Sequence, residues 1–214
     1  MNVLIFGANG YIGKHLTRLL STKKSINILA SDIHNNSFFE EKIEYIQIDL
    51  SNKTKVENID LCKFDIIYFL SGVTGTKDSF KDYNKYIQVN QIGLLNLLSN
   101  ISQQKKKPLI IFPSTRLVYE GCKEELNEDS AKAFKTIYGL SKFSGEEYLK
   151  MYNNLFKVPF IVVRICVPYG NLFSDEYSYG TIGFFIYQAS LKKRILIYGD
   201  GSQKRTFSHI NDIC

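Results

Sequence analysis

The sequence has no long hydrophobic run, and none of its apolar stretches approaches the roughly 18 residues that a membrane-spanning helix requires. No charged leader precedes the first apolar stretch, which ends at Gly7, so the sequence predicts neither a signal peptide nor a membrane anchor. Cysteine is scarce, and Cys62, Cys122, Cys166 and Cys214 share neither a metal-ligand spacing nor a paired pattern. We therefore expect free thiols, no bound metal and a reducing compartment, which together predict a cytoplasmic protein.

Charge of one sign is only in modest excess, since 27 Lys and Arg residues stand against 21 Asp and Glu residues for a net charge of +6. Partners that carry phosphate suit this balance, and nucleic acid is one of them. However, the lysines are scattered, and the runs at 105–107 and 192–194 are short enough to be solvated helix ends. Without a basic stripe or a recognised binding module, we expect no nucleic-acid partner.

What the chain does contain is a regular alternation of strand-length and helix-length segments. With 214 residues, 44% of them hydrophobic, it can form one substantial core. The strand candidates are nearly continuous apolar runs, as expected when helices cover both faces of a sheet, and the alternation predicts a doubly wound, parallel α/β sheet. The expected strands are Asn2–Phe6, Ile26–Ser31, Glu44–Ile48, Ile66–Leu70, Leu109–Ser114 and Phe160–Ile165, and the expected helices are Tyr11–Ser21, Thr54–Ile59, Asp78–Gln103 and Ile137–Phe156.

Around Pro168 the character of the sequence changes. Residues Tyr169–Gly180 are polar, aromatic and glycine-bearing, and a helix-like segment, Phe184–Lys192, and a strand-like one, Ile195–Gly199, follow. We expect a main domain over residues 1–167 and part of a smaller lobe over residues 168–214.

Three glycines, Gly7, Gly10 and Gly13, follow the first expected strand and open the first expected helix. In this context the glycines permit a tight turn, close approach of the backbone to a pyrophosphate, and close packing of helix on strand. The alternative is an ordinary strand–helix turn, but the position of the pattern at the start of a βαβ unit favours dinucleotide binding.

Two aspartates end later strands. Asp32, nineteen residues after Gly13, can accept hydrogen bonds from the hydroxyls of an adenosine ribose and would repel a 2′-phosphate. Because no arginine stands at position 33 or 34, the sequence predicts NAD in preference to NADP; the alternative is a helix-capping or turn aspartate. Asp49 could reach the adenine amino group, or equally could cap the helix that starts near Lys53.

A tyrosine and a lysine, Tyr138 and Lys142, are four residues apart and so lie on one face of a helix. A protonated lysine lowers the pKa of a phenol, so that the tyrosinate can take a proton from an alcohol as hydride leaves. Alone, such a pair is more often solvated. Thr115 supplies a hydroxyl at the carboxyl edge of the sheet, and Ser114 beside it competes for that role.

These motifs together resemble the extended short-chain dehydrogenase/reductase family, in its NAD-dependent nucleotide-sugar epimerase/dehydratase branch. The resemblance makes residues 1–167 a Rossmann domain that binds NAD and residues 168–214 part of a substrate-binding lobe. Seven segments carry it: Gly7–Gly13, Phe69–Gly72, Val89–Asn90, Pro113–Tyr119, Tyr138–Lys142, Arg164–Gly170 and Gly199–His209.

The resemblance also implies roles for individual residues. Thr115, Tyr138 and Lys142 would be catalytic, and Thr115 and Arg205 would bind substrate, with Arg205 at the diphosphate. The implied cofactor contacts are Gly7, Asn9, Gly10, Tyr11, Ile12, Gly13, Asp32, Ile33, Asp49, Leu50, Leu70, Ser71, Gly72, Asn90, Tyr138 and Lys142.

Two departures from the family pattern bear on activity. Val167 stands where relatives often have an asparagine, which puts one polar substrate contact in doubt, and relatives usually continue beyond the position of His209. Three explanations are open: the sequence is a fragment, another chain completes the site, or the protein is impaired in activity. The resemblance therefore predicts that the 214 residues bind cofactor but turn over weakly, with apolar surface of Phe184–Ile197 left uncovered.

The resemblance leads to an NAD-dependent epimerase that inverts C4 of a nucleotide sugar through a transient 4-keto intermediate, as a homodimer paired through its two long helices. The alternatives are a keto-sugar reductase that releases its cofactor each turnover, and a non-catalytic dinucleotide-binding regulator. A 4,6-dehydratase is not expected, because dehydratases carry an Asp-Glu pair after the catalytic threonine and this chain has Arg116 and Leu117 there. The nearest carboxylate, Glu120, is five residues on.

Overall fold

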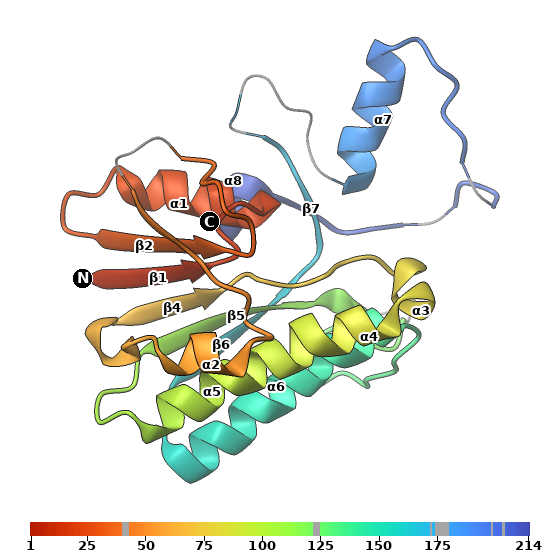
Figure 1. Cartoon of the computed structure of the whole chain (residues 1–214). Helices are drawn as coiled ribbons and strands as arrows, with labels where there is room; N and C mark the ends of the chain where they lie inside the picture. Colours follow the sequence, from red (N-terminus) through yellow and green to blue (C-terminus); the bar gives the residue numbers. More distant parts are fainter. Residues whose placement is uncertain (40–42, 122–124, 172, 174–179, 198, 203) are drawn as a thin grey trace. The chain divides into compact units, whose positions relative to one another are not determined.

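The computed structural model of the chain describes residues 1–39, 43–121, 125–171, 173, 180–197, 199–202 and 204–214 (Figure 1). It divides into two compact units, Met1–Arg164 and Ile165–Cys214. No helix among these residues is both long and apolar enough to cross a membrane. Cys62, Cys166 and Cys214 are free thiols, whereas Cys122 lies outside the described residues.

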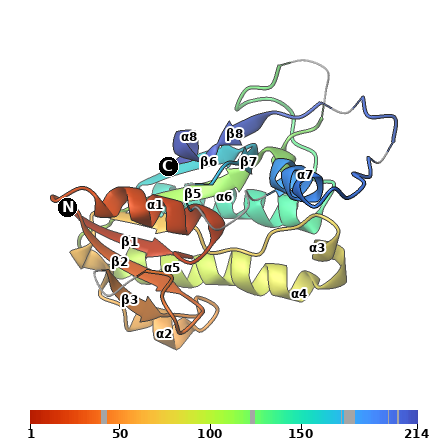
Figure 2. The same cartoon turned by 90° about the horizontal axis from the view of Figure 1, so that it is seen from above.

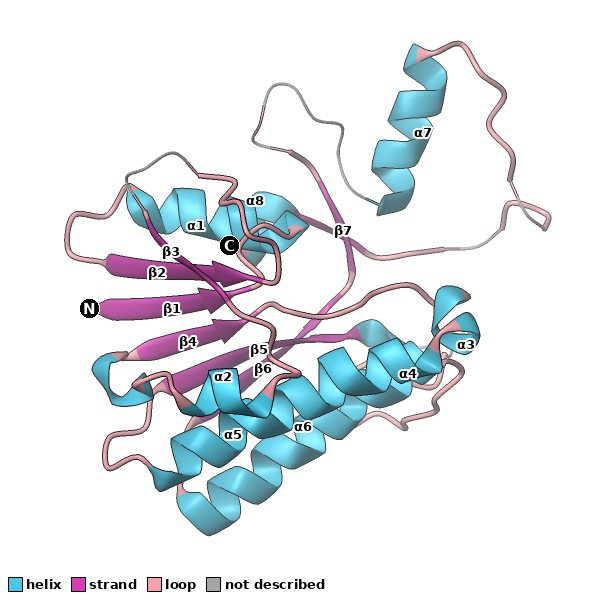
Figure 3. Cartoon of the chain, viewed as in Figure 1, coloured by secondary structure: helices cyan, strands magenta, loops and turns pink. Residues whose placement is uncertain are grey.

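The first unit is built on a parallel six-stranded sheet (Figure 3). In spatial order its strands are β3 (Glu44–Gln47), β2 (Asn27–Asp32), β1 (Asn2–Phe6), β4 (Ile66–Phe69), β5 (Leu109–Thr115) and β6 (Phe160–Ile165). This order confirms the expected doubly wound α/β class. It reverses direction at β1, and ligands of such sheets bind at the carboxyl ends of the strands beside the reversal.

The strand register brings the ends of the central strands together. Phe6 on β1 lies opposite Ser31 on β2 and opposite Phe69 on β4. The segments that follow these three residues, which include the glycine loop and Asp32, therefore leave the sheet at one edge.

Helices flank this sheet. The connections that include them are right-handed, so the reversal at β1 places α1 on one face and α5 and α6 on the other (Figure 1). Helices α5 and α6 lie side by side in both views (Figure 1, Figure 2). The helices are α1 (Tyr11–Ser21), α2 (Lys53–Glu57), α3 (Asp78–Lys81), α4 (Tyr83–Tyr86), α5 (Gly93–Gln103) and α6 (Ile137–Phe156), with short 3₁₀ turns η1 (Leu61–Lys63) and η3 (Arg116–Val118).

The main core lies between the sheet and these helices. In α5, Leu94, Leu97, Leu98 and Ile101 recur at helical spacing and are fully buried. Helix α6 packs closely on β5, because a Cβ added at Gly145 would lie 2.6 Å from the ring carbon Cζ of Phe112. This close packing fixes the height of α6 over the end of β5.

The long helix expected over Asp78–Gln103 is wrong as a single element. Helix α3 ends at Asp82, whose φ and ψ of −133° and 58° are not helical and whose carboxylate caps Lys85 at the start of α4. The chain then continues through a π-helix, η2 (Ile87–Ile92), into α5. π-Helical turns inside helices are often found at functional sites.

The second unit holds a two-stranded parallel pairing of β7 (Val167–Tyr169) with β8 (Phe207–His209). Helix α7 (Gly180–Ser190) starts four residues before the expected Phe184, and α8 (Ile210–Ile213) buries Ile210. The strand expected over Ile195–Gly199 is wrong, because Ile195–Ile197 have no regular structure; residue 198 is outside the described range. Strands β7 and β8 each have three residues and lie far apart in the sequence, so no local sequence pattern predicts that they pair.

Candidate functional site

The three glycines of the first loop have distinct structural roles. Gly7 adopts a φ of +79°, and a Cβ there would lie 2.6 Å from the backbone nitrogen of Ser71. A Cβ on Gly13 would lie 2.0 Å from the carbonyl oxygen of Gly7, so α1 can approach the loop only without a side chain there. A Cβ at Gly10 would have one neighbour within 4 Å, the Gly7 carbonyl oxygen, at 3.1 Å. The space above Gly10 is therefore open to a ligand.

The amino end of α1 is suited to an anion. Its N-cap, Gly10, offers no side-chain hydrogen bond, and the first turn, with Tyr11 and Ile12, contains no acidic residue. With no capping side chain from Gly10 and no acidic side chain in the first turn, the helix dipole favours negative charge at this end.

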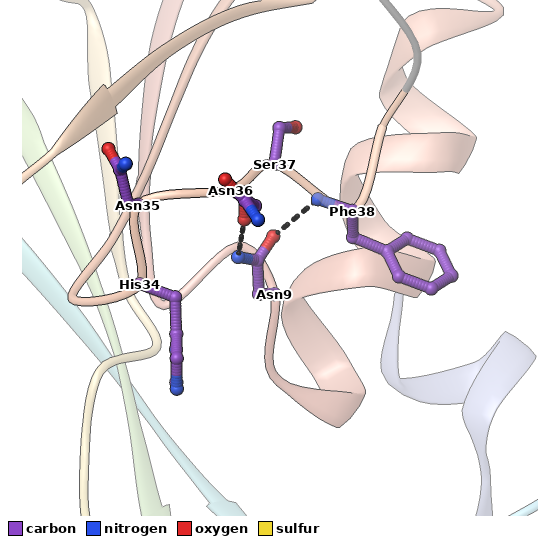
Figure 4. A pocket seen from close by; sticks show the side chains of 6 residues that line it. All are labelled: Asn9, His34, Asn35, Asn36, Ser37 and Phe38. Carbon is purple, nitrogen blue, oxygen red and sulfur yellow. Dashed lines mark hydrogen bonds between the residues drawn. The ribbon is translucent and has the colours of Figure 1, made fainter.

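Asn9 uses its side chain to hold the loop that follows β2 (Figure 4). Its Nδ2 donates to the carbonyl of Asn36 at 2.8 Å, and its Oδ1 accepts from the backbone N–H of Phe38 at 2.9 Å. These bonds shape a pocket of about 470 Å³ lined by Asn9, His34, Asn35, Asn36, Ser37 and Phe38. No sequence motif indicated residues 34–38, although this mostly polar run begins two residues after Asp32, a position that could have pointed to it.

Asp32 adjoins this pocket and is 8% exposed. Its Oδ2 accepts from the backbone N–H of Asn9 at 3.1 Å, and its Oδ1 lies 2.8 Å from Nδ1 of His34. The imidazole is largely exposed and can move aside, and a carboxylate has further lone pairs for ribose hydroxyls. Ile33, next in the chain, is 53% exposed.

Asp49 and Leu50 follow β3. The Asp49 carboxylate accepts from the N–H and the hydroxyl of Ser51, at 2.9 and 2.7 Å. The cap of α2 is instead Asn52, whose side chain accepts from Lys55, so the helix-capping alternative for Asp49 is wrong. Leu50 is buried in the core.

The loop after β4, Leu70–Gly72, is held by a buried asparagine of the π-helix. Asn90 accepts from the N–H of Val73 at 2.8 Å, and its amide donates to the Val73 carbonyl and to Ser141 Oγ on α6, both at 3.1 Å. A Cβ at Gly72 would lie 3.2 Å from Asn90 Oδ1 and 3.7 Å from Lys142 Nζ. Asn90 thus ties the loop to the helix that carries Lys142.

Thr115, Tyr138 and Lys142 come from two elements in contact. Thr115 ends β5, is buried, and accepts through Oγ1 from the N–H of Leu117 at 3.3 Å. The first turn of α6 lies against the same segment, because a Cβ at Gly139 would lie 3.0 Å from the Leu117 carbonyl oxygen. Tyr138 and Lys142 project from successive turns of this end of α6. Edge-to-face contact with Tyr86, with ring centroids 6.3 Å apart, supports the Tyr138 ring.

Lys142 is only 6% exposed, and its Nζ lies 4.5 Å from the centre of the Phe112 ring. Burial lowers the pKa of Lys142 to about 8, while the charge of Glu146 acts in the opposite direction. Its ammonium makes no hydrogen bond to another residue in the part of the chain that the structure describes.

Ser114, the competitor of Thr115, is already engaged, because its Oγ donates to the carboxylate of Glu146. This arrangement favours Thr115 as the hydroxyl that faces a ligand. Glu146 and Arg164 form an ion pair with a 2.6 Å contact, which the sequence analysis missed. The signal available for Glu146 was its spacing of four residues from Lys142. Arg205 lies in the second unit, exposed, shortly before β8.

Comparison with known proteins supplies the family. A Bacillus subtilis protein described as an uncharacterised UDP-glucose epimerase is 26% identical over 223 residues, which cover 99% of this chain and 70% of the relative. A dTDP-D-glucose 4,6-dehydratase of Dictyostelium discoideum is 29% identical over 99% of this chain and 53% of its own length. The crystal structure of a Bacillus cereus UDP-glucuronic acid 4-epimerase with UDP-glucuronic acid and NAD matches with a TM-score of 0.83 at 26% identity, over 100% of this chain and 70% of that one.

A family model, the NAD dependent epimerase/dehydratase family, matches residues 3–214. That span contains the glycine loop, Asp32 and the Thr115–Tyr138–Lys142 group. The chain belongs to the NAD dependent epimerase/dehydratase family, which confirms the expected branch and its cofactor, NAD.

Proposed function

We propose that this protein is an NAD-dependent nucleotide-sugar epimerase that inverts the C4 centre of the sugar through a transient 4-keto intermediate. The observation that carries the proposal is the contact of the first turn of α6, which carries Tyr138 and the buried Lys142, with the segment that follows Thr115 at the end of β5. The Bacillus cereus 4-epimerase, similar over the full length of this chain, supports it.

The residues present fit NAD. The open space at Gly10 and the uncapped end of α1 suit a pyrophosphate, and Asp32 beside the 470 Å³ pocket suits an adenosine ribose. The Lys142 ammonium, with no hydrogen bond to a described residue, can donate to the hydroxyls of the second ribose. Bound NAD would supply a hydride acceptor, and then a hydride donor, at the sugar carbon.

The three side chains would manage the proton and the oxygen at C4. Tyr138, as the phenolate, would take the proton of the C4 hydroxyl. It would return this proton after the keto intermediate has rotated to present its opposite face. Lys142 would stabilise that phenolate by its positive charge. Thr115 would donate a hydrogen bond to the C4 oxygen and hold it in place. We further propose that Arg205 contacts the substrate diphosphate and that the protein acts as a homodimer.

The test is to incubate the purified protein with UDP-glucose, UDP-glucuronic acid and UDP-N-acetylglucosamine in the presence of NAD and to identify the products by NMR. We expect one of these to yield its C4 epimer without net use of NAD, at a low rate when the 214 residues are assayed alone. Tyr138→Phe should bind NAD normally and lose about 10²–10⁴-fold in kcat. Product formation that consumes NADH or NADPH in stoichiometric amounts would establish the reductase instead, and failure to bind any dinucleotide would exclude both enzymes.

A further inference from the structure

Glu146 is a buried carboxylate to which the proposed chemistry assigns no role. It is 1% exposed, and a charge so deep in a protein is tolerated only when other groups satisfy it. Oε1 accepts from Ser114 Oγ and, at 3.0 Å, from Arg164 Nε. Oε2 accepts from Arg164 Nη2 at 2.6 Å. Both oxygens are therefore fixed by partners on two different strands.

Each of these partners leads to an element of the candidate site. Ser114 directly precedes Thr115 on β5, and Glu146 itself follows Lys142 by one turn of α6. Arg164, on β6, also donates through Nη1 to the Tyr119 hydroxyl at 2.8 Å and to the Glu128 carbonyl at 2.9 Å. Glu146 thus connects the hydroxyl-bearing strand, the Tyr-Lys helix and the loop between them.

The surroundings of Lys142 contain few charges. Phe112 of β5, Asn90 of the π-helix and Gly72 of the loop after β4, which lie close to its ammonium, are neutral. Of the described titratable groups, Tyr138 and Glu146 lie one helical turn before and after Lys142, and Tyr86 of α4 contacts the Tyr138 ring. Of these, Glu146 opposes the effect of burial on the pKa of Lys142, and Arg164 reaches the lysine only through Glu146.

We propose that Glu146 is a positioning residue: through Ser114 it holds Thr115 against α6, and its carboxylate, oriented by Arg164, balances the charge of the Lys142 ammonium one turn away. The kinetic consequence rests on the proposed function, whereas the effect on Lys142 does not. An ion pair that merely joined α6 to β6 would stabilise the fold without moving the titration of Lys142.

The two parts of the role separate in different variants. Glu146→Gln keeps the shape but removes the charge, so the pKa of Lys142 should fall by about one unit. Glu146→Asp keeps the charge and should retain most of the Lys142 titration, while its shorter side chain loses the bond to Ser114. Ser114→Ala removes that bond alone, so it should lower kcat severalfold and leave the Lys142 titration in place.

The experiment follows the Cε signals of ¹³C-labelled lysine by NMR from pH 6 to 11, without substrate. The Lys142 signal is identified by its loss in Lys142→Arg. Glu147→Gln is the matched control, because Glu147 is the next residue, is partly exposed, and pairs with Lys150 rather than Lys142. Circular dichroism verifies that each variant is folded. If Glu146→Gln does not fold, Glu146→Gln combined with Arg164→Gln removes both members of the ion pair, so that Arg164 is not left without its carboxylate, and carries the same expectation.

If Lys142 titrates in Glu146→Gln along the same curve as in the wild type, the proposal is overturned, whatever the effect on activity. In the epimerase assay, Glu146→Gln should shift the basic limb of the kcat profile to lower pH by the same amount, with a smaller change in KM. A shifted Lys142 titration in a protein that epimerises no nucleotide sugar would support the link between Glu146 and Lys142 and refute the proposed function.

Discussion

Burial sets the properties of the most important single residue, Lys142. Its ammonium lies among Phe112, Asn90 and Gly72, where water is largely excluded, and its pKa falls to about 8. A charged lysine kept in such a place destabilises the fold unless a ligand or a counter-charge compensates it. The buried ammonium therefore lowers the free energy of unfolding while serving the proposed reaction, and this loss of stability can be measured.

Lys142→Met should stabilise the nucleotide-free protein while abolishing epimerisation. In the unfolded chain the lysine pKa is about 10.4, so between pH 8 and 10 the unfolded state binds more protons and the free energy of unfolding rises with pH. Removing the charge should raise the free energy of unfolding at pH 7 by about 1–3 kcal/mol and flatten that rise. Urea unfolding at several pH values measures both. Lys150→Met, at an exposed lysine of the same helix, should change neither; a less stable Lys142→Met would contradict the argument.

Asp32 should determine the choice of cofactor. Its carboxylate accepts from the N–H of Asn9 in the glycine loop, and Ile33 and His34 rather than an arginine follow it. We expect NAD to bind more tightly than NADP. Asp32→Ala should weaken NAD binding about 10- to 100-fold and reduce the difference in affinity between NAD and NADP, since one charged hydrogen-bond acceptor is worth about 1.5–3 kcal/mol. Titration of both cofactors by calorimetry tests this. NADP affinity equal to that of NAD in the wild type would show Asp32 to be only a turn residue.

At the scale of elements, the periodicity of apolar residues predicted those helix and strand bounds that depend on the local sequence. The bounds of β1, α1, α6 and β6 follow the apolar pattern residue for residue. The interruption of the expected Asp78–Gln103 helix does not, because it depends on a capping bond from Asp82 and on the π-helical turn. The Glu146–Arg164 pair was equally hidden, since two charged residues on different elements become partners only when the helix packs on the sheet.

The π-helical turn should contribute to stability and to NAD binding through the side chain of Asn90. Asn90→Ala leaves the Val73 backbone and the Ser141 hydroxyl without their partner, which should lower the free energy of unfolding by about 1–3 kcal/mol. It should also weaken NAD binding, because the loop after β4 is released. Asn100→Ala is the matched control: this buried asparagine donates to Val56 and Ile59, away from that loop. Equal losses of NAD affinity in the two variants would show that Asn90 acts through stability alone.

At the scale of the whole molecule, the family includes both epimerases and dehydratases, and the carboxylates around β5 distinguish them. Dehydration requires an acid and a base to remove the C5 proton and expel the C6 hydroxyl, and family dehydratases place an Asp-Glu pair after the catalytic threonine. Here Arg116 and Leu117 occupy those positions in η3. Arginine stays protonated at any working pH, and leucine has no proton to transfer.

No other carboxylate described near the end of β5 is free to replace that pair. Glu120 is exposed beyond η3, and Glu146 is committed to Ser114 and Arg164. The proposed oxidation at C4 and return of hydride would use NAD, Thr115, Tyr138 and Lys142 without a further acid or base, so incubation with nucleotide hexoses and NAD should give an epimer and no 4-keto-6-deoxy sugar. Arg116→Asp with Leu117→Glu should not reduce NAD affinity, because neither residue is among the proposed cofactor contacts. Accumulation of the keto-deoxy product by the unaltered protein, detected by its absorbance in alkali, would overturn the assignment, because the acid and base would then have to come from groups outside this set.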